Sequence, residues 1–168
     1  MMGSLTQIPV PDNTFDLVTA LDVIEHIRDD ASAVRELVRV LQPGGYLLLT
    51  VPHRRKFYTY QDQLIGHYRR YDTVDIDRLF TSTPLVKKQT FGIYGQLMQI
   101  QMIQATNPEE TAKSINNLRR KYLYNPLFRR LWNQVVRIGS LVMKIDARLQ
   151  PLSRIMNIGY LYHFPSSP

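Results

Sequence analysis

The stretch from residue 15 to residue 51 constrains the fold most, because two apolar runs flank an amphipathic segment. Phe15 to Ala20 is rich in β-branched residues and follows a Pro-Asp-Asn turn, which favours a strand. Asp29 or Asp30 can cap a helix after it, and Pro43-Gly44-Gly45 must end that helix. Tyr46 to Val51 is nearly all apolar, as in a parallel strand covered on both faces. The helix is supported by four apolar residues at the spacing of one buried face: Val34, Leu37, Val38 and Leu41. The stretch therefore predicts one βαβ unit.

Downstream of this unit the pattern predicts shorter elements. Thr73 to Phe80 favours a helix with Thr73 as its cap, and Val86 to Tyr94 favours a strand. From residue 96 to residue 150 the pattern is helical, with breaks at Asn107-Pro108 and Asn125-Pro126. Residues 157–168 form either a last strand or a loose tail.

Composition and length exclude several classes. The 168 residues suffice for one domain, and the absence of cysteine excludes disulfides, thiolate metal sites and thiol catalysis. The sequence has neither an apolar run of spanning length nor the start of a signal peptide. We therefore expect a cytoplasmic protein, with peripheral contact to a membrane as a possible addition.

The charge is unevenly distributed along the chain. Residues 1–52 have three Lys or Arg against seven Asp or Glu, whereas residues 53–168 have eighteen against seven. Residues 113–154 alone have ten basic side chains and one acid, Asp146, interspersed with aromatic and aliphatic residues. Three interpretations stay open: a membrane-surface element, a helical cap over an active site, and a surface for nucleic acid or another partner, of which nucleic acid fits least well.

Three motifs occur in order within the predicted βαβ unit. They are Pro11-Asp12-Asn13-Thr14-Phe15-Asp16 before the first strand, Ile24-Glu25-His26 after it, and Arg39-Val40-Leu41-Gln42-Pro43-Gly44-Gly45 before the second. This series resembles class I S-adenosylmethionine-dependent methyltransferases of the type 11, or ubiquinone/menaquinone-biosynthesis, family. The resemblance implies an α/β fold with part of a Rossmann-like sheet, from the fourth strand onward, and a helical C-terminal substrate or cap region.

On this basis we expect three segments. Residues 1–95 would form a partial methyltransferase α/β core, residues 96–156 a basic helical insertion or cap, and residues 157–168 the last strand or a tail. The chain's glycines, at positions 3, 44, 45, 66, 92, 95, 139 and 159, form no G-x-G-x-G cluster, so the family's cofactor loop is missing from this sequence. The strand that bears this loop pairs with the fourth strand in the family. We therefore expect an open edge at residues 15–20, where another chain can pair.

A further resemblance concerns Gly66-His67-Tyr68-Arg69-Arg70-Tyr71, which is similar to a G-H-x-R-R-Y stretch in a bacterial subgroup associated with glycan or lipid modification. It implies a small-molecule or lipid-linked acceptor. The subgroup's preceding His-Asp pair reads Gln61-Asp62 here.

The resemblance also implies which residues contact S-adenosylmethionine. The loop after the third strand maps to Gly3, Ser4 and Leu5, with serine in place of the usual aspartate. The loop after the fourth strand maps to Ala20, Leu21 and Asp22, at the carboxyl end where α/β sheets bind ligands.

Asp22, Glu25 and His26 share one face of a helical turn. They are candidate ligands for a divalent cation, with a further ligand from His53 or His67, and an E-x-x-E-H element binds magnesium in some similar O-methyltransferases. The interpretation we favour is that Glu25 and His26 orient the loop by hydrogen bonds. No metal is therefore expected.

Methyl transfer from a sulfonium requires alignment, and a base only if the acceptor loses a proton. His26 or His67 is the candidate base. Arg69, Arg70 and Tyr71 are candidates for binding an anionic or sugar-bearing acceptor; the alternative is a structural cluster that docks the following helix on the sheet. The predicted function is S-adenosylmethionine-dependent methyl transfer, and the alternative is a non-catalytic binding module or subunit at a membrane surface.

Overall fold

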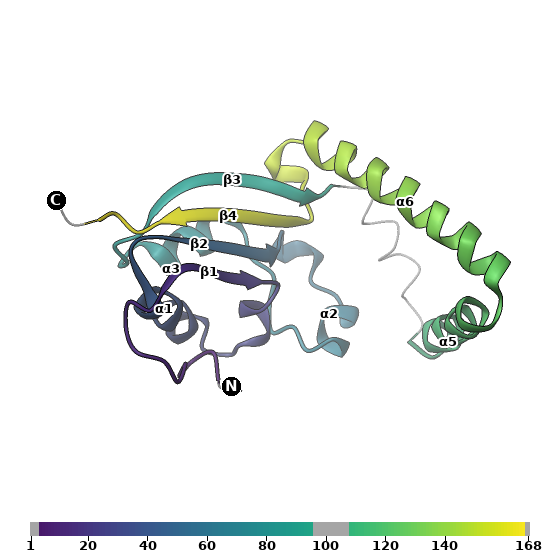
Figure 1. Ribbon diagram of the computed structural model, residues 1–168, viewed down its shortest axis with the longest axis horizontal. Helices are drawn as coiled ribbons and strands as arrows, with labels where there is room; N and C mark the ends of the chain where they lie inside the picture. Colours follow the sequence, from purple (N-terminus) through teal and green to yellow (C-terminus); the bar gives the residue numbers. More distant parts are fainter. Residues whose placement is uncertain (1–3, 96–107, 167–168) are drawn as a thin grey trace.

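The computed structural model describes residues 4–95 and 108–166 of the chain, and its centre is a four-stranded sheet (Figure 1). The strands are β1 (Phe15–Leu21), β2 (Leu41–Pro52), β3 (Val86–Tyr94) and β4 (Asn157–His163), in the order β1-β2-β4-β3. β1 and β2 are parallel, and β4 is antiparallel to both of its neighbours. The predicted βαβ unit is thus confirmed, and of the two alternatives for residues 157–168 the structure has a strand at residues 157–163.

Helices and short 3-10 turns connect the strands. They are η1 (Ile24–His26), α1 (Asp30–Val40), η2 (Arg55–Phe57), α2 (Tyr60–Leu64), α3 (Thr73–Phe80), α5 (Pro108–Tyr124), α6 (Pro126–Leu149) and η3 (Leu152–Arg154). Asn125 accepts a hydrogen bond from the Phe128 amide and caps α6, which explains the break predicted at Asn125-Pro126. The helical pattern predicted for residues 96–107 lies outside the described residues.

The ends of α1 follow from its capping residues. The Asp29 carboxylate accepts from the Ser32 amide at 2.9 Å, as predicted for the cap. The helix ends at Val40, because Leu41 already pairs with Phe15 in the sheet. Gly44 has φ +85, and a Cβ on Gly45 would lie 2.9 Å from the Asp16 carbonyl oxygen. The Pro-Gly-Gly element thus combines a left-handed residue with a close approach of two chain segments.

One prediction about a cap is wrong. α3 has its predicted bounds, but its N-cap is Asp72 and not Thr73. Asp72 and Asp75 form a reciprocal capping box, which satisfies more free amides than a threonine one residue later would.

The core lies between the sheet and the layer formed by α1 and α3. Leu47, Leu49 and Val51 of β2 are fully buried, and Phe80 of α3 stacks on Tyr162 of β4 with ring centroids 4.2 Å apart. On the opposite face Leu17 is 58% exposed and Tyr46 43% exposed. The prediction that the strand at residues 46–51 is covered on both faces is therefore not met at Tyr46.

The outer edge of β1 is open in the part of the chain that the structure describes, since β2 is the strand that pairs with it. This agrees with the open edge predicted at residues 15–20. At the other end of the molecule, α5 and α6 extend away from the sheet (Figure 1). Among the described residues, no helix is long and apolar enough to cross a membrane.

β4 lies inside the sheet, between β2 and β3, although it follows the helical segment in sequence. Residues 157–163 are therefore part of the same sheet as β1, β2 and β3, which lie within residues 15–94. The division into three segments stays a prediction.

Candidate functional site

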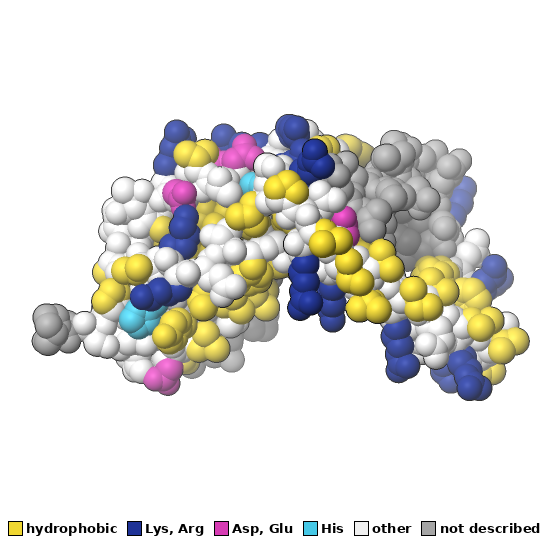
Figure 2. All heavy atoms as spheres, turned by 90° about the horizontal axis from the view of Figure 1, so that it is seen from above, with side chains coloured by type: hydrophobic (Ala, Val, Ile, Leu, Met, Phe, Trp, Pro, Cys, Tyr) yellow, Lys and Arg dark blue, Asp and Glu magenta, His cyan; other side chains and the backbone are white. Residues whose placement is uncertain are grey.

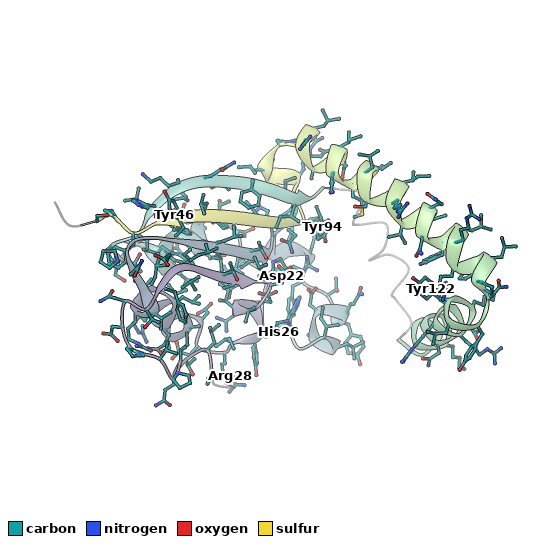
Figure 3. All side chains as sticks on the ribbon, in the orientation of Figure 1. Asp22, His26, Arg28, Tyr46, Tyr94 and Tyr122 are labelled. Atoms are coloured by element: carbon teal, nitrogen blue, oxygen red, sulfur yellow. The ribbon has the colours of Figure 1, made fainter. Side chains whose placement is uncertain are left out.

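The site lies at the edge of the sheet where β1 and β2 both end at their carboxyl termini, with Asp22 and His26 next to each other beyond β1 (Figure 3). Asp22 has φ +53, and its amide donates to the Thr50 carbonyl oxygen at 3.1 Å. Its carboxylate accepts from the Thr50 hydroxyl at 3.1 Å and from the Asn157 amide at 2.8 Å. The ends of β1, β2 and β4 thus meet at this one carboxylate.

Glu25 follows in the turn η1 and is the least expected feature of the site. Its side chain is 0% exposed, and neither carboxylate oxygen accepts a hydrogen bond from a described residue. Burial raises the pKa of Glu25 to about 7, and the nearby charge of Asp22 acts in the same direction. A buried carboxylate without hydrogen bonds is costly, so the position requires an explanation.

Two histidines lie against Glu25. The rings of His26 and His67 meet edge to face with centroids 4.6 Å apart, and His67 Nε2 is 3.9 Å from Glu25 Oε1. His26 Nδ1 is 3.1 Å from the Gly66 carbonyl oxygen. Burial lowers the pKa of His67, although a hydrogen bond with Asp62 opposes this effect. Both rings therefore have fixed orientations, and His67 is neutral near pH 7.

Asp62 holds the second wall of the site in place. It is 1% exposed in its side chain, lies 3.0 Å from His67 Nδ1, and forms an ion pair with Arg70 at 2.8 Å. Its carboxylate also accepts from the Thr59 amide in a capping box at the start of α2. Burial opposes ionisation of Asp62, but the bonds from Arg70, Thr59 and His67 outweigh it and lower its pKa. The loop that follows α2 is therefore anchored by one ionised side chain.

A cavity of about 280 Å³ opens between these groups. The residues that line it come from the ends of the four strands, from η1, and from α2 and the loop after it: Asp22, Glu25, Pro52, Gln61, Asp62, Ile65, His67, Arg70, Tyr94, Met156 and Asn157. Four of the residues singled out from the sequence thus line one cavity: Asp22, Glu25, His67 and Arg70.

Arg69 and Tyr71 point away from this cavity. Arg69 donates to Asp30 at 2.6 Å and to the Arg28 carbonyl oxygen at 2.8 Å, while the buried Tyr71 hydroxyl donates to the same Asp30 carboxylate at 2.9 Å. Burial raises the pKa of Tyr71. These bonds join the loop to the start of α1, as in the structural alternative, and a role in acceptor binding stays a prediction for both residues.

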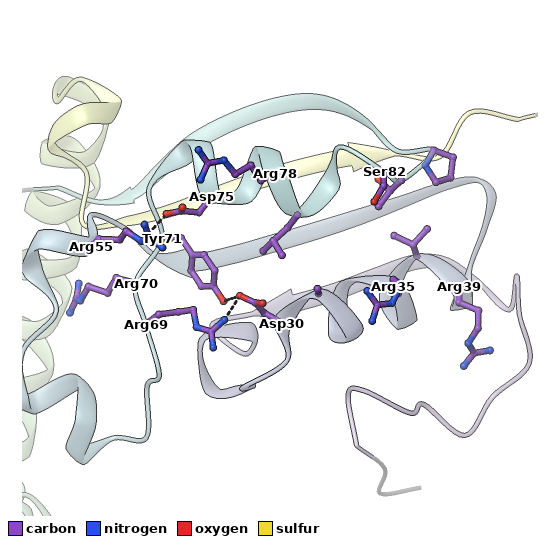
Figure 4. A pocket seen from close by; sticks show the side chains of 15 residues that line it. Asp30, Arg35, Arg39, Arg55, Arg69, Arg70, Tyr71, Asp75, Arg78 and Ser82 are labelled. Atoms are coloured by element: carbon purple, nitrogen blue, oxygen red, sulfur yellow. Dashed lines mark hydrogen bonds and ion pairs between the residues drawn. The ribbon is translucent and has the colours of Figure 1, made fainter.

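A second, larger cavity of about 550 Å³ lies between α1 and α3. Figure 4 shows the arginines around it, with Arg55 paired to Asp75 and Arg69 to Asp30. Carboxylates thus neutralise part of its positive charge.

The remaining predicted residues lie elsewhere or behind the cavity. Ala20 is buried in β1, and Leu21 is exposed at the end of that strand. The Ser4 hydroxyl bonds to Thr6 at 2.7 Å, and Leu5 packs against the core, so neither lines the cavity with Asp22. Their assignment to the cofactor stays a prediction.

His53 was one possible further metal ligand. It bonds to the Tyr71 carbonyl oxygen at 2.7 Å and is not part of the histidine cluster, which contains His67.

Sequence reasoning missed two residues of the site. Asp62 was noted as the second member of the Gln61-Asp62 pair, but the Thr59-to-Asp62 spacing of a capping box could have placed it at a helix start. Asn157 had no such signal, because 135 positions separate it from Asp22.

Part of the sequence is similar to known methyltransferases. Residues 1–49 match the model of the type 11 methyltransferase domain. A probable S-adenosylmethionine-dependent methyltransferase of Mycolicibacterium smegmatis is 33% identical over 94 residues, which are 55% of this chain and 37% of that protein. The ubiquinone/menaquinone biosynthesis C-methyltransferase of Shewanella sediminis is 45% identical over 42 residues, which are 25% of this chain and 17% of that protein.

Solved structures share the fold. The YcgJ protein of Bacillus subtilis matches 99% of this chain and 70% of its own, with a TM-score of 0.55 and 18% identity. A phosphoethanolamine N-methyltransferase of Haemonchus contortus, solved with S-adenosyl-L-methionine, matches 97% of this chain and 36% of its own, with a TM-score of 0.53 and 16% identity. The chain spans only 37% and 35% of the length of two mycobacterial relatives.

Proposed function

Because the chain contains part of a class I S-adenosylmethionine-dependent methyltransferase domain, we propose that it contributes the acceptor side of a methyl-transfer site and one wall of the cofactor site. The observation that carries this proposal is the parallel pair β1-β2, which ends at Asp22 beside the 280 Å³ cavity. Ligands of open α/β sheets bind outside the carboxyl ends of such strands. Ala20, Leu21 and Asp22 would therefore face the cofactor, and the cavity would receive the acceptor.

The chemistry requires few protein groups. Methyl transfer needs the nucleophile, the methyl group and the sulfur in line, together with a base if the acceptor must lose a proton. His67 is the better placed base of the two histidines. Asp62 fixes the ring of His67, and the lowered pKa of His67 favours its neutral form. Arg70 lies beside it and would contact an anionic acceptor.

Calorimetric titration with S-adenosylhomocysteine tests the cofactor site, after circular dichroism has established that the chain is folded. We expect micromolar binding by the parent chain and at least tenfold weaker binding by Asp22→Ala. The matched control is Asp16→Ala, in the same strand but at its opposite end. A folded parent chain that does not bind would refute the proposal for this polypeptide alone.

We further propose that the acceptor is lipid-linked or glycan-linked and that α6 brings the site to a membrane surface. Figure 2 shows hydrophobic side chains in a row along this helix, with basic side chains beside them. The row is formed by exposed residues at spacings of three and four: Leu131, Val135, Ile138, Val142, Ile145 and Leu149. Arg130, Arg137 and Lys144 recur every seven residues on an adjacent face. An interfacial helix combines these two features.

Sedimentation with vesicles tests this part. Binding should be stronger to vesicles with anionic phosphatidylglycerol than to pure phosphatidylcholine, and it should weaken as salt rises. Ile138→Glu should abolish it, whereas Val74→Glu, at an exposed apolar position on α3, should leave it unchanged. Equal binding by both variants would refute the role of α6.

The alternative function is a non-catalytic binding module or subunit that uses the same helix. The exposed apolar row on α6 favours this alternative, because membrane binding through that row does not require the cofactor. A folded chain that binds anionic vesicles but not S-adenosylhomocysteine would support this alternative.

A further inference from the structure

Glu25, His26 and His67 form a compact group with the atoms of a metal site. One ligand atom from each side chain lies within 4.8 Å of the other two. Glu25 and His26 are adjacent in η1, whereas His67 approaches from the loop after α2. The chain therefore brings the group together from two separate segments.

The tautomers of both histidines leave the same nitrogen available. The Gly66 carbonyl oxygen can only accept, so His26 Nδ1, at 3.1 Å from it, holds the proton. The Asp62 carboxylate, which also accepts from the Thr59 amide and from Arg70, has the same effect on His67 Nδ1, at 3.0 Å. Each Nε2 atom is then an unprotonated donor. Histidines that bind metals usually make such a bond from the other ring nitrogen.

The third ligand is a buried carboxylate without a hydrogen bond from a described residue. Both Glu25 oxygens are inaccessible to solvent and accept no hydrogen bond from the described residues. Buried charges in proteins are normally paired or bind a metal. An ion at this point would give both oxygens the interaction that they lack.

The electrostatic surroundings also favour a cation. Asp22, Glu25 and Asp62 line the cavity together with one guanidinium, that of Arg70. Arg70 pairs with Asp62 on the side of His67 Nδ1, whereas His67 Nε2 is directed toward Glu25.

We propose that Glu25, His26 and His67 bind a divalent transition-metal ion, such as Zn²⁺, through one carboxylate and two Nε2 atoms. Two imidazoles and a carboxylate are a common ligand set for zinc and ferrous iron and leave at least one position open. Ligands at about 2.1 Å from an ion are about 3.4 Å apart in tetrahedral geometry, so atoms within 4.8 Å of one another must approach by up to about 1.4 Å. Asp22 lies outside this group, and its Oδ1 accepts hydrogen bonds from Thr50 and Asn157. The sequence alone had led us to expect no metal.

The open position would face the cavity. A water or hydroxyl bound there would lose its proton more readily, which would replace the histidine base described above. Only this last step depends on the proposed methyl transfer. Binding of the ion itself does not.

Titration with Co²⁺ and with Zn²⁺ tests the site directly, the first by visible absorption and the second by calorimetry. The chain should bind one equivalent of either ion. Glu25→Gln, His26→Gln and His67→Gln should each weaken binding at least tenfold, and Asp62→Asn should weaken it about tenfold to a hundredfold by freeing the ring of His67. His163→Gln, at the end of β4 and outside the group, is the matched control.

The outcomes separate the ion from the methyl transfer. A folded parent chain without affinity for either ion, or ligand variants that bind as tightly as the His163 control, would overturn the inference. Circular dichroism of each variant excludes unfolding as the cause of a loss. Ion binding without S-adenosylhomocysteine binding would support the metal site and count against the proposed function. Binding of S-adenosylhomocysteine without ion binding would support the proposed function and overturn the metal site.

Discussion

The effect of replacing Glu25 with glutamine on the free energy of unfolding should be more favourable at alkaline than at acidic pH, although the substitution alters a residue of the site. The pKa of Glu25 is raised from its ordinary 4.5 to about 7 by burial. Below pH 4.5 the side chain is protonated in both the folded and the unfolded chain, and it carries no charge penalty. As the pH rises from 4.5 to about 7, the unfolded chain releases the proton first, so the free energy of unfolding falls.

The size of this loss follows from the same two values. The shift in the pKa of Glu25 from 4.5 to about 7 lowers the free energy of unfolding by about 3 kcal/mol above pH 7. At pH 5 the same shift lowers it by less than about 1 kcal/mol. Glutamine does not ionise, so Glu25→Gln removes the pH-dependent part. Its own buried amide adds a cost that is the same at both pH values. The change in unfolding free energy caused by the substitution should therefore be about 2 kcal/mol more favourable at pH 8 than at pH 5.

Urea unfolding followed by circular dichroism measures this difference, in buffers with a chelator so that no bound ion stabilises the parent chain. Asp62→Asn is the matched comparison at a second buried carboxylate. Its pKa is lowered in the folded chain, so its stabilising effect is present at pH 8 and fades in acid. Because this loss occurs only below the ordinary value of 3.8, Asp62→Asn should cost nearly the same stability at pH 8 and at pH 5, in contrast to Glu25→Gln. An equal effect of Glu25→Gln at the two pH values would refute the argument that an uncompensated charge is buried there.

Three further predictions concern the sheet. Leu49→Ala, at a fully buried position in the central strand β2, should lower the free energy of unfolding by about 2–5 kcal/mol in urea titrations. Gly45→Ala should lower it by about 1–3 kcal/mol, because the added Cβ would meet the carbonyl oxygens of Asp16 and Gln42 at 2.9 Å; the same substitution at Gly139, where a Cβ would meet nothing, should not have this steric cost. Leu17→Lys, on the open strand β1, should reduce concentration-dependent association measured by light scattering, whereas Val74→Lys on α3 should not.

The fold was predictable where the sequence pattern is local. The apolar run at residues 15–20 and the spacing of Val34 and Leu37 predicted β1 and α1. The start of β2 was predicted wrongly, because the strand begins at Leu41 and not at Tyr46, and the Pro-Gly-Gly element lies inside it. The cap of α3 was misplaced by one residue because Asp72 and Asp75 compete with Thr73 for the same amides. Exposure of Leu17 and Tyr46 could not be predicted from apolar character, since the same pattern fits a strand buried on both sides.

The candidate site was predictable only in part, because long-range contacts assemble it. Asp22, Glu25 and His26 are close in sequence, and their proximity in space follows from that alone. His67 joins them through Asp62 and the Gly66 carbonyl, neither of which has a sequence signal for this role. The burial of Glu25 is a tertiary property, so its raised pKa and its lack of partners could not be inferred from the residues.

The position of Asp22 links the open edge of β1 to the site. Thr50 and Asn157 hold its carboxylate from the side of β2 and β4, so a ligand on its other side must be contacted from across the edge of β1. The resemblance to class I methyltransferases assigns that place to the strand that bears the glycine-rich loop. A segment that pairs with β1 would thus also supply the second wall of the cofactor site. Occupation of the edge and binding of the cofactor should then stabilise each other, as two ligands of one conformation do. On this argument, Leu17→Lys should weaken S-adenosylhomocysteine binding, although residue 17 does not lie next to Asp22. An unchanged affinity would show that pairing at the edge of β1 and binding of the cofactor are independent.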